Sequence, residues 1–157
     1  MQRIASFEEL LDVMSNLHDC PFDLDKAMVD EAAGRWIGRF LRPLWEDPGA
    51  EHKKVDLLFS RSRLPVALGS LCFEGVTNVQ VVDDQGIGRY TLNEIERAPH
   101  GVRLCFNEAM RIDLHLAGDF GATYDEQPLP GVRAIYQQFL LLQTGPTIEE
   151  QVDSKFS

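Results

Sequence analysis

Alternation of apolar and polar residues between Met110 and Leu116 is the feature that most restricts the fold of this chain. In this stretch, MRIDLHL, every second residue is apolar, and the residues between them are charged or histidine. A period of two is that of a β-strand with one buried face, and sheets with one solvated face are typically antiparallel. The stretch therefore predicts an antiparallel sheet and places Asp113 and His115 on its solvated face.

Similar patterns recur through residues 71–116, where short apolar runs alternate with turn sequences such as Asp83–Gly86 and Ala98–Gly101. We expect antiparallel strands at Val66–Phe73, Thr77–Val82, Tyr90–Ile95, Val102–Phe106 and Met110–Leu116. The alternation also predicts which side chains are buried: Leu71, Phe73, Val102, Leu104, Phe106, Met110, Ile112, Leu114 and Leu116.

A helix is expected to precede the sheet. Ser6 and Glu9 have the spacing of a capping box, in which each side chain satisfies a backbone N–H of the first turn. Apolar residues then follow at helical spacing, which predicts a helix over Phe7–Asn16. Pro21 prevents the helix from continuing.

Residues 23–44 are compatible with two structures. Apolar residues repeat every four positions from Met28 to Leu44, as in a helix. Strands at Ala27–Asp30 and Arg35–Leu41 with a turn between them fit equally, because Gly34 readily adopts the positive φ of such a turn. We favour the hairpin, since glycines weaken helices and aromatic residues suit strands.

The remaining segments predict a mixture of loop, strand and helix. We expect a loop at residues 46–54, a strand at Val55–Phe59 and a loop-rich stretch at Gly118–Pro130 with room for one short strand at Ala122–Tyr124. Apolar residues at helical spacing predict a C-terminal helix over Val132–Leu142, with a strand at Phe139–Leu142 as the alternative for its end. Residues 147–157 have the composition of a mobile acidic tail.

These expectations define an α+β fold. It consists mainly of an antiparallel β-sheet, as a meander, a sandwich or a partly open barrel, with an N-terminal and a C-terminal helix. The 157 residues suit one compact domain, which we expect to span residues 1–146.

Charge and composition exclude some classes of partner. A net charge of −10 argues against binding to nucleic acid or to an anionic membrane surface, because both require Lys and Arg. No apolar run reaches the roughly 18 residues that a membrane-spanning helix needs, so we expect a cytoplasmic protein. The three cysteines show neither a disulfide framework nor a zinc motif.

Two pairs of residues are candidates for a binding site. His18 and Asp19 precede Cys20, but neighbours on an extended chain point to opposite faces, so helix capping and a turn explain them better. Asp113 and His115 share a strand face and would need further ligands to hold a metal. We therefore assign no catalytic residue, metal or cofactor.

Parts of the chain resemble a group of small uncharacterised bacterial proteins. The resemblance is carried by Leu17–Cys20 with Phe22, the turn at Asp30–Gly34 and the run Leu71–Leu116, within residues 7–117. It implies a short helix ending in Leu-His-Asp, then a β-hairpin, then a meander, and so also favours the hairpin above. Some proteins with a comparable start look like toxin-immunity proteins, which neutralise a partner by binding it.

Together these patterns favour a non-enzymatic binding or protein-interaction module in the bacterial cytoplasm. Its partner would be a protein or a second copy of the chain, and the acidic charge is compatible with a basic protein. The alternative is a metal-binding protein or a hydrolase that uses His18, Asp19, Asp113 and His115. A site of that kind requires His18 and His115 to converge in a concave pocket.

Overall fold

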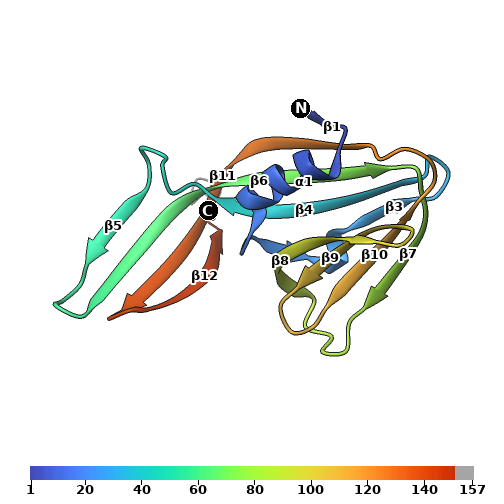
Figure 1. Ribbon diagram of the computed structural model, residues 1–157. Helices are drawn as coiled ribbons and strands as arrows, with labels where there is room; N and C mark the ends of the chain where they lie inside the picture. Colours follow the sequence, from blue (N-terminus) through green and yellow to red (C-terminus); the bar gives the residue numbers. More distant parts are fainter. Residues whose placement is uncertain (151–157) are drawn as a thin grey trace, which may run out of the picture. The chain divides into compact units, whose positions relative to one another are not determined.

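The computed structural model describes residues 1–150, which form two compact units (Figure 1). Unit 1 consists of residues 1–41 and 69–126, and unit 2 of residues 42–68 and the chain from residue 127 onward. Strands that contribute residues to both units are β4 (Arg35–Pro43), β6 (Phe59–Glu74) and β11 (Ala122–Phe139). Each unit is thus assembled from two separate stretches of sequence.

The N-terminal helix of unit 1 is confirmed as α1 (Phe7–Leu17). The Ser6 side chain accepts a hydrogen bond from the Glu9 backbone N–H at 3.2 Å, and the Glu9 carboxylate accepts one from the Ala5 N–H at 2.8 Å. Leu10, Val13 and Leu17 are buried at helical spacing. The helix therefore packs its apolar side on the unit and exposes its acidic first turn.

The hairpin interpretation of residues 27–41 is also confirmed. Strand β3 (Met28–Asp30) pairs antiparallel with β4, and Asp30 lies opposite Arg35. Gly34 has a φ of +61°, a conformation that glycine adopts without steric cost. The preference of the aromatic side chains for strands therefore outweighed the helix-like repeat of apolar residues every four positions.

The expected meander is corrected in its strand order. The strand expected at Val66–Phe73 belongs to β6, which neighbours β11 and β4 rather than the next strand. The other strands are β7 (Val76–Val82), β8 (Arg89–Ala98), β9 (Gly101–Phe106) and β10 (Arg111–Leu116). β8, β9 and β10 pair in succession, but β7 pairs with β10 rather than with β8. Three consecutive strands with the fourth placed beside the far one form a Greek key. Alternation within strands sets which face is buried and does not determine which strand is the neighbour.

On the other side of β8 lies β2 (Pro21–Asp23), which pairs with both β8 and β4. The 3₁₀ helix η1 (Leu24–Lys26) follows β2, and β1 (Gln2–Ile4) pairs with β11. The overall strand order is β1-β11-β6-β4-β2-β8-β9-β10-β7. Because this order ends at β1 and β7, the sheet is not closed.

The core of unit 1 agrees closely with the expected buried set. Eight of its nine residues are buried, and Leu116 is partly buried. Phe22 lies at the centre of an aromatic group, with ring centroids 5.1 Å from Phe40 and 4.8 Å from Phe106. Trp36, almost fully buried, joins this group. Burial of large aromatic rings makes this the main hydrophobic core of the unit.

Unit 2 consists largely of two β-hairpins. β5 (Glu51–Lys54) pairs with β6, and β12 (Leu142–Glu150) pairs with β11. Since β6 and β11 are neighbours, the order here is β5-β6-β11-β12. The expected strand at Val55–Phe59 is wrong: β5 lies in the preceding stretch, and Val55–Leu58 forms the turn of the hairpin. A highly charged edge strand lacks the apolar alternation on which the prediction relied.

The expected C-terminal helix is wrong. Val132–Phe139 belongs to β11, and the described residues contain no α-helix besides α1. Ala134 and Ile135 are adjacent in β11 and both buried, so burial does not alternate strictly here, which gives apolar spacing that resembles a helix. The register shift opposite residue 136 places the extra residue on β12. Within the stretch expected to be loop-rich, Gly118–Pro130, the short strand expected at Ala122–Tyr124 is the start of β11, which continues through the rest of the stretch.

The fold is therefore mainly antiparallel β-sheet with one N-terminal helix. Residues 147–150, where we expected the acidic tail to begin, form the end of β12 and pair with β11. The rest of that expected tail, residues 151–157, lies outside the described residues.

Candidate functional site

His18 and Asp19 lie at the C-terminal end of α1. His18 is the C-cap residue, and its Nδ1 atom lies 2.9 Å from the carboxylate of Asp19. Asp19 has a φ of +60°, and its backbone N–H donates to the carbonyl oxygen of Leu92 at 2.8 Å. Both side chains are more than half exposed. Their arrangement is that of a helix end held against β8.

Asp113 does not lie on a solvated face, contrary to expectation. Its exposed fraction is 9%, and both carboxylate oxygens accept hydrogen bonds from Arg103, at 2.6 and 3.1 Å. Arg103 lies directly opposite Asp113 on β9. Hydrogen bonding from this guanidinium lowers the pKa of Asp113. A carboxylate engaged in this way is already neutralised, which counts against a role as metal ligand.

His115 lies two residues further along β10, and its ring is 5.7 Å from that of His100. Asp113 and His115 are therefore neighbours on one strand, and His18 and Asp19 are neighbours on the helix end. Among residues 1–150, no hydrogen bond, ion pair or ring contact joins His18 to His115. Each pair is held by its own local contacts, and the convergence that the alternative function requires stays a prediction.

A third cluster lies on β8 and β9, where the side chains of Glu94, Glu96 and Cys105 come within 4.8 Å of one another. Both glutamates are exposed. Desolvation and the neighbouring carboxylates raise the pKa of the Cys105 thiol. A thiol that resists ionisation beside two solvated carboxylates is typical of an ordinary strand surface.

The most unusual surface of the described chain is the end of unit 2. Here the turn of the β5–β6 hairpin and the turn of the β11–β12 hairpin lie side by side (Figure 1), joined by a 2.8 Å hydrogen bond from the Leu140 N–H to the Leu58 carbonyl. Leu57 is 89% exposed and Leu141 98%. We call the exposed apolar residues of these two turns the apolar tip: Val55, Leu57, Leu58, Phe139, Leu140, Leu141 and Leu142.

Local hydrogen bonds hold the first turn of the apolar tip in place. The Asp56 carboxylate accepts from the backbone N–H groups of Leu58 and Phe59, at 2.7 and 2.8 Å. The second turn contains Leu140 at a φ of +54°, a conformation that disfavours bulky side chains and favours glycine. A leucine at this position places an apolar side chain on the surface in a strained backbone conformation.

Basic side chains lie directly behind the apolar tip. We call Lys53, Lys54 and Arg61 the basic flank. Lys53 lies opposite Arg61 in the β5–β6 pairing. Two like charges in directly opposite positions destabilise a strand pair. Among residues 1–150, none of the three forms an ion pair with a carboxylate. The basic flank is therefore a group of cations without a salt bridge among the described residues, and a carboxylate close to it in the sequence is Asp56 in the adjoining turn.

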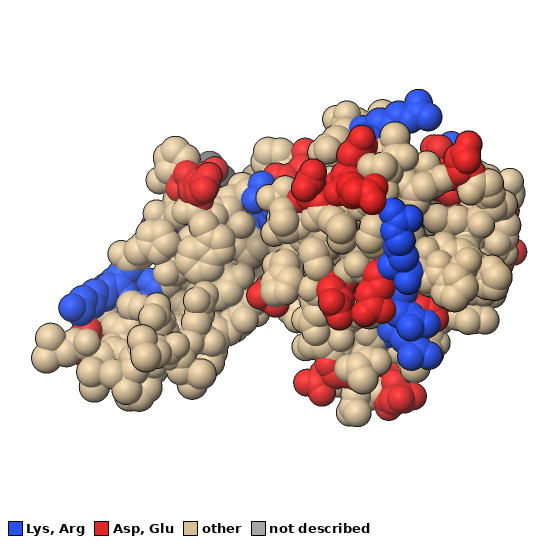
Figure 2. Space-filling view, viewed as in Figure 1, with Lys and Arg blue, Asp and Glu red and all other residues tan. Residues whose placement is uncertain are grey.

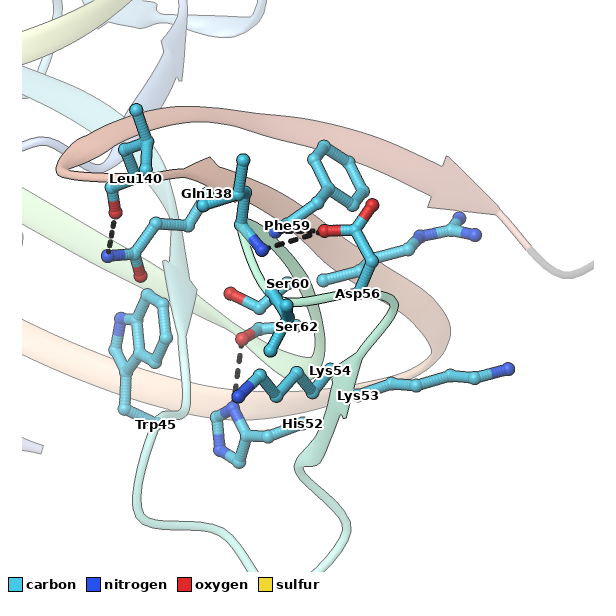
Figure 3. Close-up of a pocket in the computed structure, with 13 residues that line it drawn as sticks. Trp45, His52, Lys53, Lys54, Asp56, Phe59, Ser60, Ser62, Gln138 and Leu140 are labelled. Carbon is cyan, nitrogen blue, oxygen red and sulfur yellow. Dashed lines mark hydrogen bonds between the residues drawn. The ribbon is translucent and has the colours of Figure 1, made fainter.

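A cavity of about 570 Å³ at this end is lined mainly by the β5–β6 hairpin, including Asp56, with Gln138 and Leu140 from the β11–β12 hairpin (Figure 3). His52 and Ser62 line it and share a 2.9 Å hydrogen bond, and Lys54 lies alongside them, whereas Lys53 points away. Trp45 stacks on His52 and contacts Tyr136, with centroid distances of 6.1 and 4.7 Å. The cavity thus has hydroxyl and cationic groups on one side and an aromatic group at its edge.

The two units differ in charge. Unit 1 carries 18 acidic and 8 basic residues, whereas the described part of unit 2 carries 6 of each. The net charge of −10 is therefore that of unit 1. In the space-filling view, the end of unit 2 that bears the hairpin turns is mainly uncharged, with Lys and Arg beside it (Figure 2).

Sequence patterns did not indicate this surface, although one signal was available. The run Phe139-Leu140-Leu141-Leu142 suggests the end of a helix or a strand, and Val55–Phe59 a strand. Two short apolar runs, one of them following paired lysines, are also what two exposed turns would contain. Only the pairing of the strands places these runs at turns.

Comparison with known proteins adds no assignment. No protein-family model, curated protein or solved structure matches this chain. The resemblance to small uncharacterised bacterial proteins and to immunity proteins thus stays a prediction. Within residues 1–150, no helix is both long and apolar enough to cross a membrane.

Proposed function

We propose that the protein is a non-enzymatic binding module that contacts its partner through the apolar tip. The observation that carries this proposal is the exposure of seven apolar side chains on two adjoining turns. Contiguous apolar surface of this kind is rare on isolated soluble proteins and marks interaction sites. An immunity-like role would be one form of such binding.

The sparse packing of unit 2 supports the proposal. Its buried side chains are few, namely Pro43, Leu64, Val66, Ala67, Ala134 and Ile135. Most residues of β5 and β12 are exposed. The two hairpin ends thus contribute little to a core of their own, and a partner would bury what the fold leaves exposed.

Site-specific photo-crosslinking in the producing cells tests the proposal. A photoreactive residue in place of Leu141 should give a discrete adduct, with a protein, a lipid or a second copy of the chain. The same residue in place of Ile87, which is also exposed but lies in unit 1, is the matched control. The Leu141 adduct should disappear when Leu57→Ser is added. Equal labelling at the two positions, or none at Leu141, would refute the proposal.

A further inference from the structure

We propose that the apolar tip enters the interface of a lipid bilayer containing anionic phospholipids. This inference names the class of partner and rests on the binding role proposed above. It is carried by the position of the exposed leucines, the basic flank behind them and the distance between the two.

The leucines lie at the ends of the hairpins rather than across a flat or hollowed face. Leu57 and Leu141 are each almost fully exposed, on neighbouring turns that are joined through Leu58 and Leu140. A protein partner would have to provide a cavity for two such protruding turns. A bilayer accepts protruding apolar side chains without a matching shape, because its acyl chains rearrange around them.

The basic flank supplies charge complementarity to an anionic surface. Lys53, Lys54 and Arg61 have no carboxylate partner among the described residues. The net charge of the whole chain argued against such a surface, but the acidic excess belongs to unit 1, and unit 2 is balanced. Basic residues next to an apolar segment attract anionic headgroups by electrostatic interaction.

The spacing between the two groups fits the layers of a bilayer. Lys54 ends β5 directly before the turn, and Arg61 lies in β6, three residues after Leu58. The extended chain from Leu58 to Arg61 spans roughly 10 Å. Amphipathic elements enter the headgroup and acyl boundary to a depth of roughly 5–10 Å. Leucines at that depth would leave the cations at the level of the phosphates.

Two further features agree with this placement. The cavity between the hairpins brings Lys54, His52 and Ser62 together, and a phosphate of a headgroup would find cationic and hydroxyl donors there (Figure 3). Trp45, about half exposed, lies at the edge of the cavity. Tryptophan is enriched at membrane interfaces, where its ring is apolar and its N–H remains hydrated.

Vesicle flotation with the full chain tests the inference. Vesicles of phosphatidylcholine alone are compared with vesicles containing about one quarter phosphatidylglycerol. We expect binding to the anionic vesicles that weakens as salt is added. Leu57→Ser with Leu141→Ser should lower the partition coefficient on the order of 100-fold. Replacing the basic flank by glutamine should cost about fivefold per charge on anionic vesicles only.

Controls separate loss of binding from loss of fold. Ile87→Ser removes an exposed apolar side chain from unit 1 and should leave flotation unchanged. Circular dichroism and thermal unfolding should show all variants folded, because the substituted side chains are exposed. If the wild-type chain does not float, or if the tip variant floats as well as the wild type, the inference is overturned.

The crosslinking experiment distinguishes failure of this inference from failure of the proposed function. A protein adduct at Leu141 without vesicle binding would replace the lipid by a protein partner and leave the binding surface in place. An adduct between two copies of the chain without vesicle binding would likewise overturn the inference of lipid binding and would indicate self-association. If the experiments give neither an adduct nor vesicle binding, both proposals are overturned.

Discussion

The backbone N–H of Leu140 donates a hydrogen bond of 2.8 Å to the carbonyl oxygen of Leu58, joining two turns that are distant in sequence. Each turn alone is a short loop with a few apolar residues. Held together, they present one continuous apolar surface. The bond thus makes the two hairpin ends a single structural feature, and variants in either turn should affect the same binding event.

Leu140→Gly should stabilise the protein. The φ of +54° at Leu140 is strained for a leucine and ordinary for glycine, and the side chain is mostly exposed. Glycine relieves this strain but also gives the unfolded chain more conformational freedom, which favours unfolding. The first effect is larger, so the free energy of unfolding should rise by about 0.5–1 kcal/mol. Chemical denaturation measures the change. The control Leu141→Gly, at a position without positive φ, should lower it; similar effects at both positions would contradict the prediction.

Asp113→Asn should destabilise the protein near neutral pH by about 1–2 kcal/mol, because it weakens a partly buried pair with Arg103. The pKa of Asp113 is lowered in the folded state. Its contribution is therefore fully present above the ordinary aspartate pKa of about 4 and is lost as pH falls through the lowered pKa of the folded protein.

The measurement is urea unfolding of wild type and variant across this acidic range. The difference between them should shrink as pH falls. Asp84→Asn serves as control, because Asp84 is exposed and should change stability by no more than a few tenths of a kcal/mol. A difference that persists unchanged at low pH would show that the charge of Asp113 is not responsible.

Gly101→Ala should destabilise unit 1. A Cβ at Gly101 would collide with the carbonyl oxygen of Leu114 on the paired strand β10. Backbone on both sides must then shift, at a cost of about 1–3 kcal/mol. Gly121→Ala is the matched control, since the nearest atom to its Cβ would be a carboxylate oxygen of Glu74 at 3.9 Å. Thermal unfolding should show a lower midpoint for the first variant only.

The cysteines should react slowly with alkylating agents in the native protein. Burial is the main cause that raises the pKa of Cys72 and of Cys105, and Cys20 is buried. A raised pKa means less thiolate at a given pH, so alkylation should begin at higher pH than in the unfolded chain. Mass spectrometry of native and denatured protein across pH measures this. Faster reaction of Cys105 in the native state would instead indicate an activated thiol.

The strands of unit 1 could be predicted from the sequence because alternation reports burial directly. Leu104, Ile112 and Leu114 are fully buried, as their spacing indicated. The helix α1 was recognisable from Ser6 and Glu9, whose side chains do cap its first turn. These signals are local, so they do not depend on the rest of the fold.

Other parts depended on contacts that the sequence does not reveal. β11 resembled a helix because two adjacent residues, Ala134 and Ile135, are both buried, and its pairing with β12 decides the outcome. Asp113 seemed solvated because its burial depends on Arg103 from the neighbouring strand. Exposure of Leu57 and Leu141 follows from their location at turns, which only strand pairing determines.

Residues 2–4 of β1 pair with residues 122–124 of β11, so β1 leaves the ribosome long before its partner. Unit 2 interrupts unit 1 in the sequence, since residues 42–68 emerge before unit 1 is complete at residue 126. Both units depend on pairings of long sequence separation, which form slowly. A nascent chain that stalls before residue 122 would leave β1 without its partner, an exposed edge open to mispairing and aggregation.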